Sequence, residues 1–169
     1  MPRSPSTRIP ALLRAAAKVR ERAHAPYSRY PVGAAVLAGG RIFAGCNMEN
    51  SAFPLSVCAE RNAMAMAVAA GFKRIDAVAV VGGQHRSAPP CGGCRQVLAE
   101  FAEPGTPVVY ASERGQTTRT TIGALLPSAF TPADVIGAAE GSPRGRRATR
   151  SRAVPGAGRS AVRVPLRSK

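Results

Sequence analysis

The pattern of apolar and polar residues predicts three helices along the chain. Residues 10–23 have a weak apolar face, and Pro10 suits a first helical turn. Residues 58–70 are rich in Ala and Met and are followed by Gly71, a common helix stop. Residues 91–101 place Val97, Leu98 and Phe101 at helical spacing, with Pro104 beyond the end. We therefore expect helices over these three ranges.

Shorter apolar runs between these segments predict strands. Residues 32–38 and 41–46 flank Gly39-Gly40, which is typical of a two-residue hairpin turn. Residues 75–81 form a continuous apolar run, as expected for a strand that is covered on both faces. Residues 107–111 and 117–122 flank a polar turn and predict a second hairpin. The order of helix, hairpin, helix, strand, helix and hairpin indicates a three-layer α/β fold around a mixed sheet.

Charge divides the chain into a near-neutral centre and two basic ends. The chain has 169 residues, of which 45% are hydrophobic, and a formal charge of +15. Residues 1–22 carry a net +5, residues 23–139 a net +2 and residues 140–169 a net +8. The last range has no aromatic residue and is rich in Gly, Pro, Ser and Arg. We expect a flexible N-terminus over 1–9, one domain over 10–139 and a basic disordered tail over 140–169.

The sequence predicts a cytoplasmic protein without a membrane span. No run of about 18 apolar residues occurs. Arg14 and Lys18 interrupt the first apolar run, which argues against a secretory signal. Four cysteines in a chain of this kind favour a metal site or catalysis over a disulfide framework.

Three of the four cysteines lie where helices are predicted to begin. Cys58 opens one helix, and Cys91 and Cys94 open the next. The partial positive charge at a helix N-terminus favours thiolate over thiol. Three thiolates suit Zn²⁺ and leave a fourth position for water. Glu60 would lie near such a metal and could move a proton between water and substrate, as in the signature of zinc deaminases.

A structural zinc site or a redox pair can also contain a Cys-x-x-Cys motif. Structural zinc would need a fourth ligand, for which Cys46, His24 and His85 are the candidates. Cys46 falls inside a predicted strand, where a small buried hydrophobic residue is the simpler interpretation. Both histidines fall in predicted loops without a second ligand at metal spacing. A catalytic zinc site is therefore the favoured interpretation.

Five motifs occur in order between about residues 10 and 138: PYSRYPVG at 26–33, GCNMEN at 45–50, VCAER at 57–61, PCGGCRQ at 90–96 and LLPSAF at 125–130. Together they resemble cytidine deaminase of the small homotetrameric type. The resemblance implies a five-stranded mixed sheet with helices on both faces. It also implies that Cys58, Cys91 and Cys94 bind zinc, that Glu60 shuttles the proton and that Arg61 tunes the thiolates.

The same resemblance implies a set of substrate contacts. Asn47 and Glu49 match the pair that holds the ribose 3′-hydroxyl, which would make the substrate a nucleoside. The remaining contacts would be Tyr30, Ala59, Phe53 and Phe130. The two phenylalanines would act across subunit boundaries, with core packing as the alternative. Tyr30 stands where the family usually has Phe, and Phe53 stands where Tyr is common.

The implied reaction is the hydrolytic deamination of cytidine and deoxycytidine, carried out with zinc by a homotetramer. Three rivals stay open. One is deamination of another aminated pyrimidine, such as a blasticidin-type antibiotic. Another is a polynucleotide-editing deaminase, which would need a basic groove that the near-neutral centre does not offer. The third is a nucleic-acid-binding module with structural zinc. Nucleic-acid binding is expected, if anywhere, of the basic tail.

Overall fold

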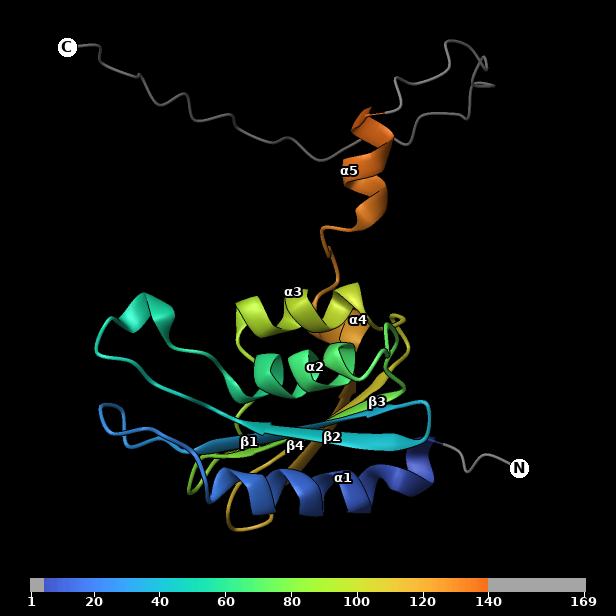
Figure 1. Cartoon of the computed structure of the whole chain (residues 1–169). Helices are drawn as coiled ribbons and strands as arrows, with labels where there is room; N and C mark the ends of the chain where they lie inside the picture. The colour runs from blue at the N-terminus through green and yellow to red at the C-terminus, as the bar shows by residue number, and fades with distance from the viewer. Residues whose placement is uncertain (1–4, 140–169) are drawn as a thin grey trace, which may run out of the picture.

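The computed structural model describes residues 5–139, and Figure 1 shows a sheet between two layers of helices. The elements in chain order are α1 (Pro5–Arg20), β1 (Val32–Ala38), β2 (Arg41–Cys46), the short 3-10 helix η1 (Phe53–Leu55), α2 (Ala59–Ala69), β3 (Ala77–Gly82), α3 (Gly92–Glu100), β4 (Pro107–Ala111), β5 (Thr117–Thr121), α4 (Ile122–Leu125) and α5 (Pro132–Ala139). The predicted tail over 140–169 lies outside the described residues.

The five strands form one mixed sheet in the order β2-β1-β3-β4-β5. Strand β1 is antiparallel to both β2 and β3, β3 is parallel to β4, and β4 is antiparallel to β5. The glycine turn between β1 and β2 and the polar turn between β4 and β5 close the two predicted hairpins. Every residue of β3 is buried, as its continuous apolar run predicts. The three-layer fold with a five-stranded mixed sheet is confirmed.

Helix α1 covers one face of the sheet, and it begins earlier than predicted. It starts at Pro5 rather than Pro10, so residues 5–9 do not belong to a flexible terminus. Ile9 is 2% exposed and packs with Leu12 and Ala16 against the sheet. Its burial stabilises the first turns and offsets the backbone hydrogen bond that Pro10 cannot donate.

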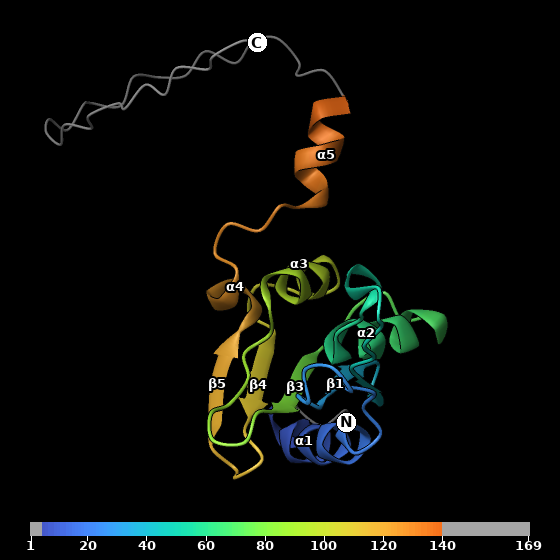
Figure 2. The same cartoon turned by 90° about the vertical axis from the view of Figure 1, so that its left-hand side faces the viewer.

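Helices α2, α3 and α4 cover the opposite face, as Figure 2 shows from the side.

Two glycines allow the helices to approach the strands closely. A Cβ on Gly33 would lie 2.0 Å from the carbonyl oxygen of Ala16 in α1. A Cβ on Gly45 would lie 2.5 Å from the backbone nitrogen of Ala63 in α2. The position of α2, which begins next to Cys58, therefore depends on a glycine in β2.

Helix α5 projects away from the two helical layers (Figures 1 and 2). The sequence interpretation did not include it, although its start signal is present. The backbone N–H and the hydroxyl of Thr131 both donate to the carboxylate of Asp134 at 2.7 Å, so the acidic residue of the first turn binds back to the residue that precedes the helix. Within residues 5–139, none of the helices combines the length and the apolar character that a membrane span requires.

Candidate active site

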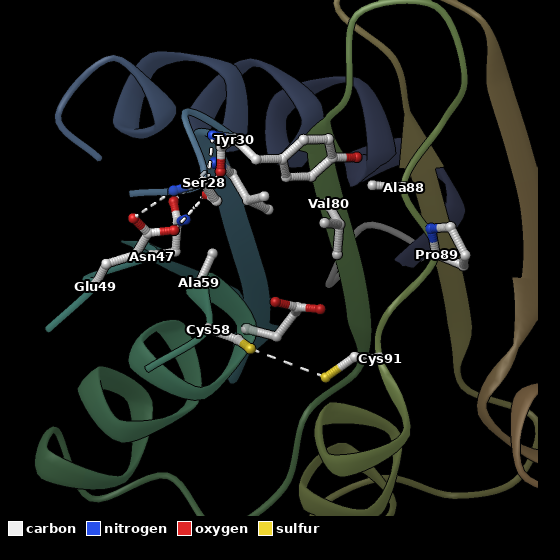
Figure 3. A pocket seen from close by; sticks show the side chains of 12 residues that line it. Ser28, Tyr30, Asn47, Glu49, Cys58, Ala59, Val80, Ala88, Pro89 and Cys91 are labelled. Atoms are coloured by element: carbon white, nitrogen blue, oxygen red, sulfur yellow. Dashed lines mark hydrogen bonds between the residues drawn. The ribbon is translucent and has the colours of Figure 1, made fainter. Parts of the chain in front are cut away.

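The three predicted zinc ligands meet at the N-termini of α2 and α3. Cys58 directly precedes α2, Cys91 directly precedes α3, and Cys94 lies in the first turn of α3. Their sulfur atoms all lie within 4.8 Å of one another, and those of Cys58 and Cys91 are 3.9 Å apart (Figure 3). Tetrahedral zinc with Zn–S bonds of about 2.3 Å separates two sulfurs by about 3.8 Å. The three side chains therefore fit zinc.

No fourth cysteine or histidine joins this cluster among residues 5–139. Cys46 is half-buried at the end of β2, and neither His24 nor His85 belongs to the group. A structural zinc site normally has four protein ligands, whereas a catalytic site keeps one position open. The donor set matches the catalytic type.

The surroundings of Cys58 favour its thiolate form. Hydrogen bonding with Cys94 is the largest cause, and together with Cys91 and the charge of Arg61 it lowers the pKa of Cys58 to about 6, although burial opposes the shift. The pKa of Cys94 is raised, first by the hydrogen bond with Cys58 and then by burial. Arg61 is exposed, and its charge is the smallest of the causes that lower the pKa of Cys58, so its role in tuning the thiolates stays a prediction.

Glu60 is 5% exposed in the first turn of α2. Burial raises the pKa of its carboxyl above the ordinary value of 4.5, and the nearby negative charge of Cys58 raises it further. Glu60 lines the same cavity as Cys58 and Cys91. A carboxyl group with a raised pKa in such a place is suited to accepting and returning a proton.

The cavity beside the cysteines has a volume of about 380 Å³. Val80 of β3 lines it together with Ala88 and Pro89 from the loop before α3. Figure 3 shows the ring of Tyr30 extending toward Ala88. The Tyr30 hydroxyl lies close to the backbone of Gly83. A Cβ at Gly83 would be only 2.7 Å from that oxygen. Gly83 also has a φ of +78°. A side chain at this position would therefore both strain the backbone and collide with Tyr30.

Asn47 and Glu49 line this cavity and also bind the loop between α1 and β1. The Asn47 side chain accepts from the backbone N–H of Val32 at 2.8 Å and donates to the carbonyl of Tyr30 at 3.0 Å. Glu49 accepts from the backbone N–H groups of Tyr27 at 2.9 Å and Ser28 at 3.2 Å, and from the Ser28 hydroxyl. Their predicted grip on the ribose stays a prediction.

Ser28 is a residue of this site that the sequence interpretation missed. Its hydroxyl donates to Glu49 and accepts from the backbone N–H of Tyr30 at 3.0 Å. Ser28 lies in the motif at 26–33, but a serine in a loop carries no sign of its distant partner. The hydrogen bond between Ser28 and Glu49 forms only in the folded protein, where the chain after β2 places Glu49 beside the loop.

The other predicted contacts divide into two groups. Ala59 is fully buried and lines the cavity. Phe53 and Phe130 are 69% and 63% exposed, and neither lines it. Phe53 instead packs edge-on against Tyr27, with 5.6 Å between the ring centroids. Core packing is therefore the wrong explanation for both phenylalanines, and their contact with a substrate of a neighbouring subunit stays a prediction.

Comparison with known proteins agrees with this geometry. Residues 6–112 match the family model described as the cytidine and deoxycytidylate deaminase zinc-binding region. A cytidine deaminase of Sporosarcina psychrophila is 48% identical over 124 residues, which cover 73% of this chain and 91% of that protein. One from Halalkalibacterium halodurans is 42% identical over 125 residues, or 73% of this chain and 95% of that protein.

A solved structure supports the same assignment. The crystal structure of cytidine deaminase from Burkholderia pseudomallei superposes with a TM-score of 0.68 at 46% identity, over 71% of this chain and 97% of that chain. These matches do not favour an editing deaminase, an antibiotic deaminase or a structural-zinc module. With three cysteines that fit zinc and a buried glutamate beside them, the chain belongs to the cytidine and deoxycytidylate deaminase family.

Proposed function

We propose that this chain catalyses the hydrolytic deamination of cytidine and deoxycytidine to uridine and deoxyuridine, with release of ammonia. The observation that carries the proposal is the buried carboxyl of Glu60 in one cavity with Cys58 and Cys91. The cavity is open to a small molecule and lined mostly by apolar side chains, which suits a flat pyrimidine ring. The relatives named cytidine deaminase support the choice of substrate.

Zinc held by Cys58, Cys91 and Cys94 would supply a Lewis acid that lowers the pKa of a water molecule. Glu60 accepts a proton from that water and delivers it to ring N3. The water oxygen bonds to C4, the second proton passes by way of Glu60 to the exocyclic amine, and the C4–N bond breaks. One water is consumed and one ammonia is released, so that Glu60 ends in its starting state.

Asn47 and Glu49 hold the ribose at the other side of the cavity in this proposal. Each side chain keeps hydrogen-bonding capacity beyond its contacts with the loop: a second N–H on Asn47 and lone pairs on the carboxylate of Glu49. Tyr30 and Ala59 contact the base, and Arg61 moderates the charge of the thiolates. The anionic Glu49 also disfavours a phosphate group at its end of the cavity.

We propose a homotetramer in which Phe53 and Phe130 complete the site of a neighbouring subunit. Large apolar side chains that a monomer would leave in water support this assembly: Tyr27, Met48, Phe53, Leu55, Phe130 and Val135 are all more than 40% exposed. Light scattering coupled to gel filtration measures the oligomeric state. A monomer with full activity would contradict the shared site.

We propose that residues 5–139 carry the catalysis, because α1 starts at Pro5 and Ile9 belongs to the core, and that the basic residues of 140–169 can bind nucleic acid through their charge. A cytoplasmic location fits three cysteines that must remain reduced to bind zinc. The proposed substrate is a free nucleoside, and DNA and RNA are not substrates in this proposal.

A substrate panel tests the proposal. The purified protein, loaded with zinc, is incubated with cytidine, deoxycytidine, cytidine monophosphate and a blasticidin-type nucleoside, and the ultraviolet absorbance is followed. We expect turnover of both nucleosides and little or none of the other two. A protein with one zinc per chain that leaves cytidine unchanged would contradict the proposed function. Preferential turnover of the antibiotic would show that the substrate assignment is wrong, although the reaction would still be a hydrolytic deamination.

A further inference from the structure

Both peptide groups that flank Cys91 are bound by one residue, Arg95. The backbone N–H of Arg95 donates to the carbonyl of Cys91 at 2.9 Å, which is the first hydrogen bond of α3. The side-chain Nε of Arg95 donates to the carbonyl of Pro90 at 2.8 Å. One carbonyl belongs to the peptide before the Cα of Cys91 and the other to the peptide after it. The first of these bonds is a main-chain bond that other residues at this position would also make, whereas the second depends on the arginine side chain.

Cys91 is the most exposed of the three cysteines, and the carbonyl of the residue before it is bound by the Arg95 side chain. Like Cys58 before α2, Cys91 lies at the N-cap of its helix without a side-chain capping hydrogen bond. Cys94 is buried in the helical layer, and Cys58 follows Val57, whose N–H and C=O both pair with Met48 at 2.9 Å. Packing and backbone pairing hold those two residues. Cys91 follows Pro90, whose ring is fully buried and whose carbonyl accepts the hydrogen bond from the Arg95 side chain.

The same guanidinium reaches a third segment. Its second nitrogen donates to the carbonyl of Leu125 at 2.9 Å, at the end of α4. The next residue on α3, Gln96, donates to the carbonyl of Phe130 at 2.7 Å. Two adjacent side chains of the cysteine-bearing helix thus hold the two ends of the segment 125–130.

We propose that Arg95 is a positioning residue that orients Cys91 toward the metal and fixes the segment 125–130 against α3. The proposal rests on the proposed function for the roles of Cys91 and Phe130. An arginine suits this place because its rigid fork presents separate N–H groups to separate carbonyls, whereas the ammonium of lysine is a single point. Lysine at this position would hold one carbonyl and release the other.

The test measures how fast the zinc-loaded protein releases its metal to a chromogenic chelator. Removal of a group that orients a metal ligand typically weakens metal affinity about 10- to 100-fold. We expect Arg95→Met to release zinc at least about tenfold faster than the parent, and Arg95→Lys to fall between the two. Gln96→Ala should release zinc at the parent's rate and raise the KM for cytidine, since it frees only the Phe130 carbonyl.

Two control variants separate positioning from lost stability. Leu12→Ala removes a core side chain of α1 on the opposite face of the sheet, and Arg74→Ala removes an exposed arginine that pairs with Glu103 at 2.9 Å. Both should release zinc at the parent's rate, although Leu12→Ala lowers the melting temperature. If Leu12→Ala accelerates release as much as Arg95→Met does, or if Arg95→Met releases zinc at the parent's rate, the proposal is wrong.

These outcomes stay separate from those of the proposed function. A parent protein that binds zinc and does not deaminate cytidine would contradict the proposed function, while the release rates would still decide the role of Arg95. If Arg95→Met does not fold, Arg95→Lys decides in its place. An Arg95→Lys protein that melts like the parent and releases zinc faster supports the proposal, and an unchanged rate overturns it.

Discussion

The hydroxyl of Ser28 donates a hydrogen bond to the carboxylate of Glu49, and the backbone N–H of Ser28 donates to the same carboxylate at 3.2 Å. This pair joins the loop before β1 to the segment after β2, at the edge of the cavity. The Ser28 hydroxyl also receives the N–H of Tyr30, so one serine orients both a predicted ribose contact and a predicted base contact. The shape of this end of the cavity depends on the pair.

Removal of the Ser28 hydroxyl should weaken substrate binding. We expect Ser28→Ala to raise the KM for cytidine by about three- to tenfold, because one hydrogen bond to a carboxylate is lost and Tyr30 gains freedom. Steady-state kinetics measure the effect. Thr117→Ala, in β5, removes an exposed hydroxyl that donates to the carbonyl of Gly115 and serves as the matched control. A Ser28→Ala protein with the parent's KM would contradict the proposed role.

Acid should release the same loop. The Ser28 hydroxyl, followed by the N–H groups of Tyr27 and Ser28, lowers the pKa of Glu49 below its ordinary value of 4.5. The folded state therefore binds this proton less tightly than the unfolded state does. The stabilising contribution is complete above pH 4.5 and is lost as the pH falls through the lowered pKa.

Hydrogen exchange can follow this change at the two amides concerned. After correction for the intrinsic rate, protection of the Tyr27 and Ser28 amides should fall as the pH drops below about 4.5. In Glu49→Ala, which removes both accepting oxygens, the protection should be low at every pH. Equal protection of the two amides at pH 7 in parent and variant would show that the carboxylate does not hold the loop.

Glu60→Gln should separate metal binding from catalysis. The substitution keeps the shape of the buried side chain but removes the group that accepts and returns the proton. We expect kcat to fall by about 10² to 10⁴ while the zinc content stays at one per chain. Metal analysis and absorbance assays on the same preparation measure both. A Glu60→Gln protein with normal turnover would make the assignment of Glu60 wrong.

Zinc should protect three cysteines and leave the fourth unchanged. Alkylation of the zinc-loaded and zinc-stripped proteins, followed by peptide mass spectrometry, reports each thiol separately. We expect zinc to slow modification of Cys58, Cys91 and Cys94, whose sulfurs lie within 4.8 Å of one another. Cys46 provides an internal control, because it lies outside the cluster. Equal protection of Cys46 would indicate a general tightening of the fold instead of a three-cysteine site.

Gly33 should tolerate no side chain. The Cβ of Gly33→Ala would overlap the carbonyl oxygen of Ala16, so β1 and α1 must move apart. We expect a loss of about 2 to 4 kcal/mol in the free energy of unfolding. Gly93→Ala is the matched control, because nothing lies within 4 Å of its Cβ, and alanine in a helix favours stability by up to about 1 kcal/mol. Urea denaturation of both variants measures the difference.

Local signals in the sequence accounted for much of the fold. The glycine pair between β1 and β2 determined a hairpin with the predicted bounds, and the apolar run of β3 determined a strand that is buried throughout. The start of α1 was placed five residues too late because Pro10 looks like a first-turn residue. In the structure, burial of Ile9 extends the helix back to Pro5. A contact with the sheet outweighed a local preference.

The sequence by itself determined the element order, the three cysteines and the neighbouring glutamate, because local patterns mark each element, the Cys91–Cys94 pair and the Cys58–Glu60 pair. The tertiary structure alone decided how those groups are held. Asn47 reaches a backbone group 15 residues away, Glu49 a hydroxyl 21 residues away and Arg95 a carbonyl 30 residues away. Such partners come within hydrogen-bonding distance only after the sheet has formed. The residues between two partners contain no local pattern that identifies the pair.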